Sequence, residues 1–138
     1  EGLYDTVVCL NVLEHVPDES GALANIARAL QRNGRAIILV PQNPKLYGTL
    51  DEALGHVRRY TRETLTAALD QAGFALETVL DFNRPTTPAW WWNGKVMRRR
   101  HFGKPQLKIL NLSVWLMRPL DRILPWHGAS LIAVARKR

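Results

Sequence analysis

Residues 4–18 read YDTVVCLNVLEHVPD, and this stretch decides the fold class. Its first half belongs to a short apolar run, Leu3–Leu10, which has the length and the β-favouring residues of a buried strand. Pro17 and Asp18 then interrupt the run, and Asp is a favoured residue at the start of a helix. The stretch therefore predicts a strand that passes through a polar loop into a helix.

The same alternation continues downstream. The predicted helix carries apolar residues at helical spacing, and we expect Asn33-Gly34 to end it. Thr61 is the predicted N-cap of a second helix that Gly73 ends. Further strands are expected at residues 35–40, 74–82 and 130–135. Strands alternating with helices predict an open α/β sheet, with a binding crevice at the carboxyl ends of its strands.

Two features of this pattern have functional consequences. Residues 42–60 lack a regular period and hold Pro44, Gly48 and Gly55, so we expect a long loop that closes over a ligand. The chain also opens directly on a strand of the fully buried type, which leaves one edge of that strand unpaired. We therefore expect earlier strands upstream, in a longer polypeptide.

Charge divides the chain into two parts. Residues 1–81 carry a net charge of −4 and residues 82–138 a net charge of +11. The basic part holds all five Trp within residues 83–127, where Arg98-Arg99-Arg100 follows Trp90-Trp91-Trp92, and we expect a helical insertion there. Its apolar residues form two stripes at helical spacing, namely Leu107, Leu110, Val114 and Met117, and Ile109, Leu112, Leu116 and Leu120.

Three roles remain open for this segment. It can cap the substrate side of the sheet, or make peripheral contact with an anionic membrane. Stacking on single-stranded nucleic acid is not favoured, because the aromatic residues cluster in one triplet. The single cysteine, Cys9, excludes an intrachain disulfide and is compatible with a reducing compartment. We expect a cytoplasmic protein, with the inner membrane surface as an alternative location; the oligomeric state is unknown.

Residues 4–18 resemble the fourth strand and following loop of class I S-adenosylmethionine-dependent methyltransferases. The resemblance covers about residues 3–82 and 128–137 and includes the segment GHVRRYT at 55–61. It implies a partial Rossmann-like fold made of the last strands of the sheet. The implied domain is 1–82 and 128–138, with residues 83–127 as the insertion, and its implied cofactor is S-adenosyl-L-methionine.

By resemblance, Asn11, Val12 and Leu13 line the cofactor, although core packing is an equal alternative for Val12 and Leu13. The family's glycine-rich cofactor loop, which follows its first strand, would lie upstream, and no Gly-x-Gly-x-Gly occurs in this sequence. We therefore expect this chain to be the carboxy-terminal half of a methyltransferase, with cofactor binding by these residues alone in doubt.

Glu14 and His15 follow the first strand directly, where a carboxylate can orient or charge an imidazole. The motif resembles Glu-x-x-Glu-His of ubiquinone-pathway O-methyltransferases, which use it around a divalent metal. Here Asn11 replaces the first Glu, so we expect no metal site, and packing of His15 against the next helix stays open.

The acceptor side is predicted on the 42–60 loop and on the insertion. The resemblance makes His56 a candidate base, Arg59 a candidate anion holder and Tyr60 a candidate acceptor contact, alongside His15 as a further catalytic candidate. Trp91 is a candidate substrate contact. Solvated charge for Arg59 and helix packing for Tyr60 are the alternatives.

Two functions follow. The first is methyl transfer to a small or lipid-linked acceptor, as part of a longer enzyme. The alternative is a noncatalytic interaction module that docks on a membrane or partner through the basic, Trp-rich segment.

Overall fold

The computed structural model describes residues 2–138, apart from the side chain of Leu110. Two parts of the predictions therefore lie outside the described residues: Glu1 of the predicted 1–82 segment, and the place of Leu110 in its predicted stripe. In chain order the elements are β1 (Tyr4–Leu10), α1 (Glu19–Ala29), β2 (Leu30–Pro41), α2 (Thr49–Leu54), α3 (Arg62–Gln71), β3 (Phe74–Phe82), α4 (Thr86–Trp91), α5 (Lys104–Ile123) and β4 (Ser130–Lys137). Short 3-10 turns lie at Leu13–His15 and Pro44–Leu46, and a π-helical turn at Trp92–Val96. The strands predicted from the sequence are present.

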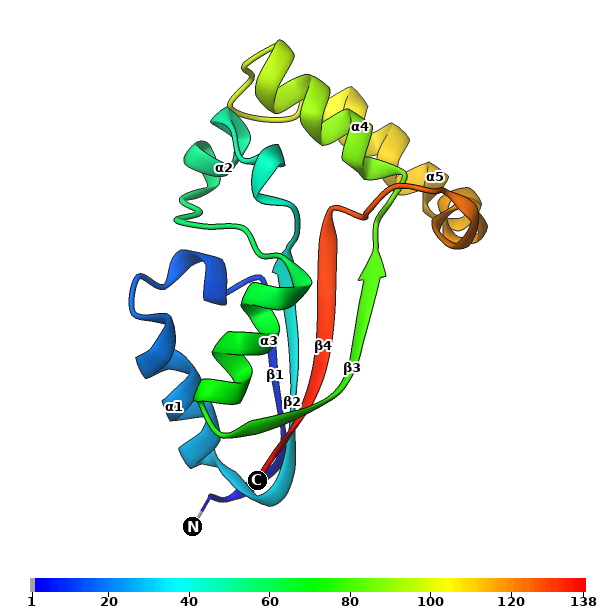
Figure 1. Ribbon diagram of the computed structural model, residues 1–138. Helices are drawn as coiled ribbons and strands as arrows, with labels where there is room; N and C mark the ends of the chain where they lie inside the picture. Colours follow the sequence, from blue (N-terminus) through cyan, green and yellow to red (C-terminus); the bar gives the residue numbers. More distant parts are fainter. Residues whose placement is uncertain (1) are drawn as a thin grey trace.

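The four strands form one sheet in the order β1-β2-β4-β3. β1 is parallel to β2, whereas β4 runs antiparallel to both β2 and β3. The carboxyl ends of β1, β2 and β3 therefore meet the amino end of β4 at one edge, where α2, α4 and α5 gather (Figure 1). This edge is where an α/β sheet binds its ligands.

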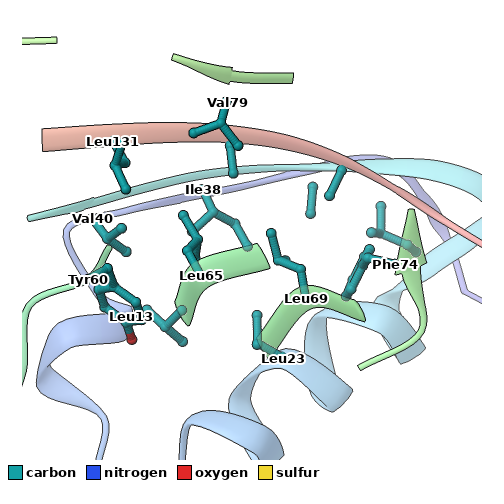
Figure 2. Close-up of a cluster of buried hydrophobic side chains, with 14 residues drawn as sticks. Leu13, Leu23, Ile38, Val40, Tyr60, Leu65, Leu69, Phe74, Val79 and Leu131 are labelled. Atoms are coloured by element: carbon teal, nitrogen blue, oxygen red, sulfur yellow. The ribbon is translucent and has the colours of Figure 1, made fainter. Parts of the chain in front are cut away.

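Helices α1 and α3 cover one face of the sheet and close the hydrophobic core (Figure 1). Leu23 from α1 and Leu65 and Leu69 from α3 are buried against Ile38 and Leu131 of the sheet (Figure 2). Burying each such side chain contributes about 1.5–3 kcal/mol, so this face fixes the strands that carry the site.

The position of β1 at the end of the sheet agrees with the expectation that one edge of this strand is unpaired. β1 lies at the end of the strand order, and its Val8 and Leu10 are 56% and 50% exposed. Leu80 of β3 is exposed as well. Apolar side chains of this size are usually covered in a folded domain.

The prediction that Asn33-Gly34 ends the first helix is wrong. Helix α1 ends at Ala29, and Leu30, fully buried in the core, already begins β2. Tyr4 pairs with Leu30 but Thr6 pairs with Arg35, so the intervening residues form an irregularity in the register. Asn33 has the left-handed φ of 64° there. Asn33 thus adopts the left-handed conformation that was expected, but at an irregularity in the β1–β2 pairing instead of at a helix end.

The expectation of an irregular 42–60 loop is also corrected. That segment folds into the Pro44–Leu46 turn and helix α2, and Leu46 and Leu50 anchor it by their burial. Helices are present within residues 83–127, as expected, namely α4, the π-turn and α5. None of the helices described is both long and apolar enough to cross a bilayer.

Candidate active site

A cavity of about 440 Å³ lies at the carboxyl edge of the sheet. Its walls come from the ends of β1, β2 and β3, the start of β4, the segment from α2 to α3, and the helices α4 and α5. The lining residues are Asn11, Glu14, His15, Pro41, Leu54, His56, Arg59, Asn83, Thr86, Ala89, Trp90, Phe102, Leu107, Ala129 and Ser130. The cavity is large enough for a small molecule.

Asp51 is the centre of the polar network in the cavity wall. Its side chain is fully buried on α2. One carboxylate oxygen, Oδ1, accepts from Arg59 Nε at 2.7 Å and pairs with His56 Nδ1 at 2.8 Å. The other, Oδ2, accepts from the Gly48 backbone N–H at 3.1 Å and Trp90 Nε1 at 3.2 Å. The residue therefore ties α2, α4 and the chain before α3 into one unit.

The hydrogen bonds of Asp51 shift its pKa. Burial acts to raise the pKa of Asp51, but the bonds from His56 and Arg59 outweigh it, and the net pKa lies below its ordinary value of 3.8. Burial lowers the pKa of Arg59, against the raising effect of the Asp51 carboxylate. The carboxylate of Asp51 is thus ionised at neutral pH.

The bond to Asp51 also fixes the tautomer of His56. An ionised carboxylate can only accept, so His56 Nδ1 carries a proton and donates it. The lone pair of the neutral imidazole is then on Nε2, which lies 3.9 Å from Glu14 Oε1. This arrangement of a carboxylate, an imidazole and a free lone pair is that of a general base.

Glu14 and His15 complete a three-residue cluster with His56. His15 Nδ1 lies 3.2 Å from the Gly55 carbonyl oxygen, which can only accept a hydrogen bond. In the neutral ring, His15 Nε2 therefore carries the lone pair, as in His56. That Nε2 lies 4.0 Å from Glu14 Oε1, and the two imidazole rings meet edge to face at 4.8 Å. Glu14 is fully buried, and neither of its carboxylate oxygens has a hydrogen-bond partner among the described residues.

Glu14, His15 and His56 therefore bring acceptor atoms together at one point of the cavity wall. Three acceptor atoms, one each from Glu14, His15 and His56, lie within 4.8 Å of one another. A buried carboxylate without a donor is costly unless a cation compensates it. Imidazole and carboxylate groups are donors that suit a divalent metal ion, and these three atoms are close enough to hold one. His56 adds a third donor atom beside Glu14 and His15, although a neutral imidazole does not restore the negative charge that Asn11 lacks.

Four of the residues predicted from the sequence line the cavity: Asn11, His15, His56 and Arg59. Arg59 is buried, and its guanidinium lies over the Trp90 ring at 4.8 Å and donates to the Gln42 carbonyl. The anion that Arg59 holds in this structure is the carboxylate of Asp51.

The other predicted residues are placed elsewhere. Leu13 and Tyr60 belong to the hydrophobic core, and burial raises the pKa of Tyr60, which keeps its hydroxyl protonated. Val12 is half exposed at the end of β1. Trp91 is half exposed, packs beside Trp92 and does not line the cavity. Packing, the alternative that the sequence left open, fits Leu13 and Tyr60 best.

Sequence reasoning missed Asp51 and Trp90. Trp90 takes the place predicted for Trp91, because neighbouring residues on a helix point about 100° apart and only one of them faces the cavity. The signal for Asp51 was its position in the first turn of a helix, three residues after Gly48, but no helix was expected there.

Comparisons with known proteins agree with this architecture. The family described as "Methyltransferase domain" matches residues 1–79. A ubiquinone biosynthesis O-methyltransferase of Aeromonas salmonicida is 44% identical over 45 residues, which is 32% of this chain and 19% of that protein.

Two solved structures show the same fold. An S-adenosylmethionine-dependent methyltransferase of Mesorhizobium loti superimposes with a TM-score of 0.59 at 18% identity, over 97% of this chain and 62% of that one. The second is the 1,6-didemethyltoxoflavin-N1-methyltransferase of Burkholderia thailandensis, with 1,6-didemethyltoxoflavin and S-adenosylhomocysteine bound. It superimposes with a TM-score of 0.55 at 18% identity, over 99% of this chain and 45% of that one. The chain thus spans about half to two thirds of the length of these structures.

Proposed function

Because this chain belongs to the methyltransferase domain family and has the α/β fold of the class I S-adenosylmethionine-dependent enzymes, we propose that it supplies the acceptor side of such an enzyme. The acceptor is a small or lipid-linked molecule. The observation that carries the proposal is the buried cluster of Glu14, His15 and His56 in the cavity wall.

Methyl transfer from a sulfonium needs few groups from the protein. The acceptor heteroatom attacks the methyl carbon in line, the sulfur–carbon bond breaks, and the acceptor loses a proton. His56 Nε2 takes up that proton, because Asp51 holds the ring with this nitrogen unprotonated. The resulting imidazolium lies beside the Glu14 carboxylate, whose oxygens have no hydrogen-bond partner among the described residues, so the charge that forms in the reaction is stabilised.

The other lining residues position the reactants. Trp90 and Phe102 present aromatic surface to the cavity, which suits a flat or apolar acceptor. Asn11, with a left-handed φ of 51° at the end of β1, and the half-exposed Val12 lie on the open side of the sheet, where we propose that the cofactor binds. Should a divalent metal bind instead, Glu14, His15 and His56 would hold it, His56 Nε2 would then not be free to take up a proton, and the metal would lower the pKa of an acceptor hydroxyl.

We further propose that the whole enzyme is longer than this chain. The exposed apolar residues of edge strand β1 support this proposal, as does the share of the solved structures that the chain covers. The upstream part would provide the glycine-rich loop and the strands that cover β1.

The test is methyl transfer by the protein extended upstream, with S-adenosylmethionine and a panel of phenolic and amine acceptors. We expect His56→Gln to lower kcat by about 10²- to 10⁴-fold, the usual contribution of a general base. His101→Gln, at an exposed position outside the cavity wall, is the control and leaves kcat unchanged. Equal turnover by His56→Gln and wild type would remove His56 as the base.

A chelator added to the same assay shows whether the cluster holds a metal ion. If His56 acts as the base without a metal, turnover is insensitive to the chelator and the purified protein contains no stoichiometric metal. A loss of turnover that added metal restores, together with bound metal that Glu14→Gln abolishes, would assign the cluster to a metal ion.

A further inference from the structure

Helix α5 exposes many large apolar side chains. None of the described side chains of this 20-residue helix is buried. Ile109, Leu112, Leu116 and Ile123 repeat at helical spacing, and they are 65%, 66%, 55% and 72% exposed. We call this set the apolar stripe of α5. A helix of a globular protein normally turns such a stripe toward the hydrophobic core of the protein.

A second set of residues on α5 is cationic. Lys104, Lys108, Arg118 and Arg122 fall on one side of the helix at 100° per residue, next to the apolar stripe, and Trp115, 75% exposed, lies among them. We call these four residues the cationic stripe. The turn before α5 adds exposed Lys95, Arg98, Arg99 and Arg100. None of these eight cations has an ion pair with a described acidic group.

The third side of α5 faces the body of the protein. Asp121, the only acidic residue after position 81, points inward, and its carboxylate accepts from the backbone N–H groups of Asn83 at 3.0 Å and Arg84 at 2.6 Å. This contact ties α5 to the end of β3. Because the one acidic side chain is used in this way, the outer surface of the helix has no acidic group.

We propose that α5 docks on an anionic lipid bilayer and lies in its interface. The apolar stripe enters the boundary between headgroups and acyl chains, the cationic stripe pairs with lipid phosphates, and Trp115 lies at the headgroup level. Helix α4 lies beside α5 (Figure 1), and Trp91 at its end and Trp92 in the next turn are half exposed.

Charge complementarity favours a bilayer over a second copy of this chain. In a two-fold dimer built on the apolar stripe, the cationic stripes of both copies would lie close together with no acidic group between them. An anionic bilayer instead provides negative charge over the whole contact. Phe102 and Leu107, beside and within the first turn of α5, line the active-site cavity, so docking would bring that cavity close to the membrane surface.

Vesicle flotation with the full chain tests the proposal without cofactor or acceptor, so its outcome is independent of methyl transfer. We expect binding to vesicles of phosphatidylcholine with phosphatidylglycerol, little binding to phosphatidylcholine alone, and weaker binding as salt is raised. The double variant Leu112→Glu with Leu116→Glu should reduce the bound fraction at least tenfold. Leu80→Glu, an exposed leucine on β3, is the matched control and should bind as wild type.

The charge contribution is tested with a second pair of variants. Arg118→Glu with Arg122→Glu should weaken binding about tenfold or more, whereas Arg28→Glu with Arg32→Glu, the same change at exposed positions near α1 and β2, should not. Circular dichroism shows whether each variant remains folded.

Four results would overturn the proposal. One is equal binding to neutral and anionic vesicles. A second is binding that survives both sets of α5 variants. A third is a dimer in buffer that Leu112→Glu dissociates while vesicles do not bind, which would assign the stripe to a second copy. The fourth is tight binding of single-stranded RNA or DNA in place of vesicles.

Discussion

Asp51 is the residue on which the geometry of the site depends most. It is fully buried, and it pairs with Arg59 while it orients His56. Removing its charge leaves the buried guanidinium of Arg59 without a counter-ion. We therefore predict that Asp51→Asn lowers the free energy of unfolding by about 3–5 kcal/mol in urea titrations. Glu52→Gln, the exposed neighbour on α2, should change it by less than about 0.5 kcal/mol.

The pKa of Asp51 gives this prediction a pH dependence. Because the folded-state pKa lies below the ordinary 3.8, the stabilisation is present above pH 3.8 and is lost as the pH falls through the folded value. The gap in unfolding free energy between wild type and Asp51→Asn should be constant at mildly acidic to neutral pH and shrink below 3.8. A gap that widens on acidification would contradict the ion pair as its source.

Single residues of the site differ in how far the sequence reveals them. His56 could be named from the resemblance of residues 55–61 to the methyltransferase family, and the structure places it in the cavity wall. Its partner Asp51 could not, because an acidic residue between Leu50 and Glu52 looks like one more solvated charge. Only tertiary packing against Arg59 and Trp90 buries it.

At the scale of elements, helix α3 shows what local signals can establish. Thr61 was the predicted N-cap, and its hydroxyl accepts from the Thr64 backbone N–H at 3.2 Å. We predict that Thr61→Ala lowers the free energy of unfolding by about 1 kcal/mol, the usual value of such a cap. Thr66→Ala within the same helix removes a hydroxyl that bonds back to the Arg62 carbonyl and caps nothing, so it should be close to neutral. Equal losses in the two variants, measured by thermal or urea unfolding, would argue against the cap.

Other elements were harder to predict for a definite physical reason. Strands such as β3 are evident from their apolar residues, and its bounds Phe74–Phe82 agree with the sequence prediction. The end of α1 was not evident from the sequence, because a left-handed residue such as Asn33 suits a helix end and a β-bulge equally well. Pairing with β1, a contact with another part of the chain, selects the bulge.

The whole molecule combines an acidic, packed part with a basic part whose helix α5 contributes no buried side chain among those described. Composition predicts this division, because net charge is a sum that needs no coordinates. Which face of α5 turns outward does not follow from composition, since the helix is apolar over most of its circumference. The contact of Asp121 with the end of β3 settles that orientation.

The final prediction concerns the open edge of the sheet. The backbone N–H of Asn11 donates to the Leu39 carbonyl of β2, and N–H groups alternate in direction along a strand. The amides of Val7 and Cys9 therefore point to β2, whereas those of Thr6, Val8 and Leu10 point to the unpaired edge. If upstream strands cover β1 in the whole enzyme, those three amides should exchange hydrogen rapidly in this chain and slowly in the protein extended upstream. Amides of the central strand β4, such as that of Ala133, should be protected in both forms. Strong protection of Thr6, Val8 and Leu10 in the 138-residue chain alone would mean that something else already pairs with this edge, and the proposed upstream strands would lose their place in the sheet.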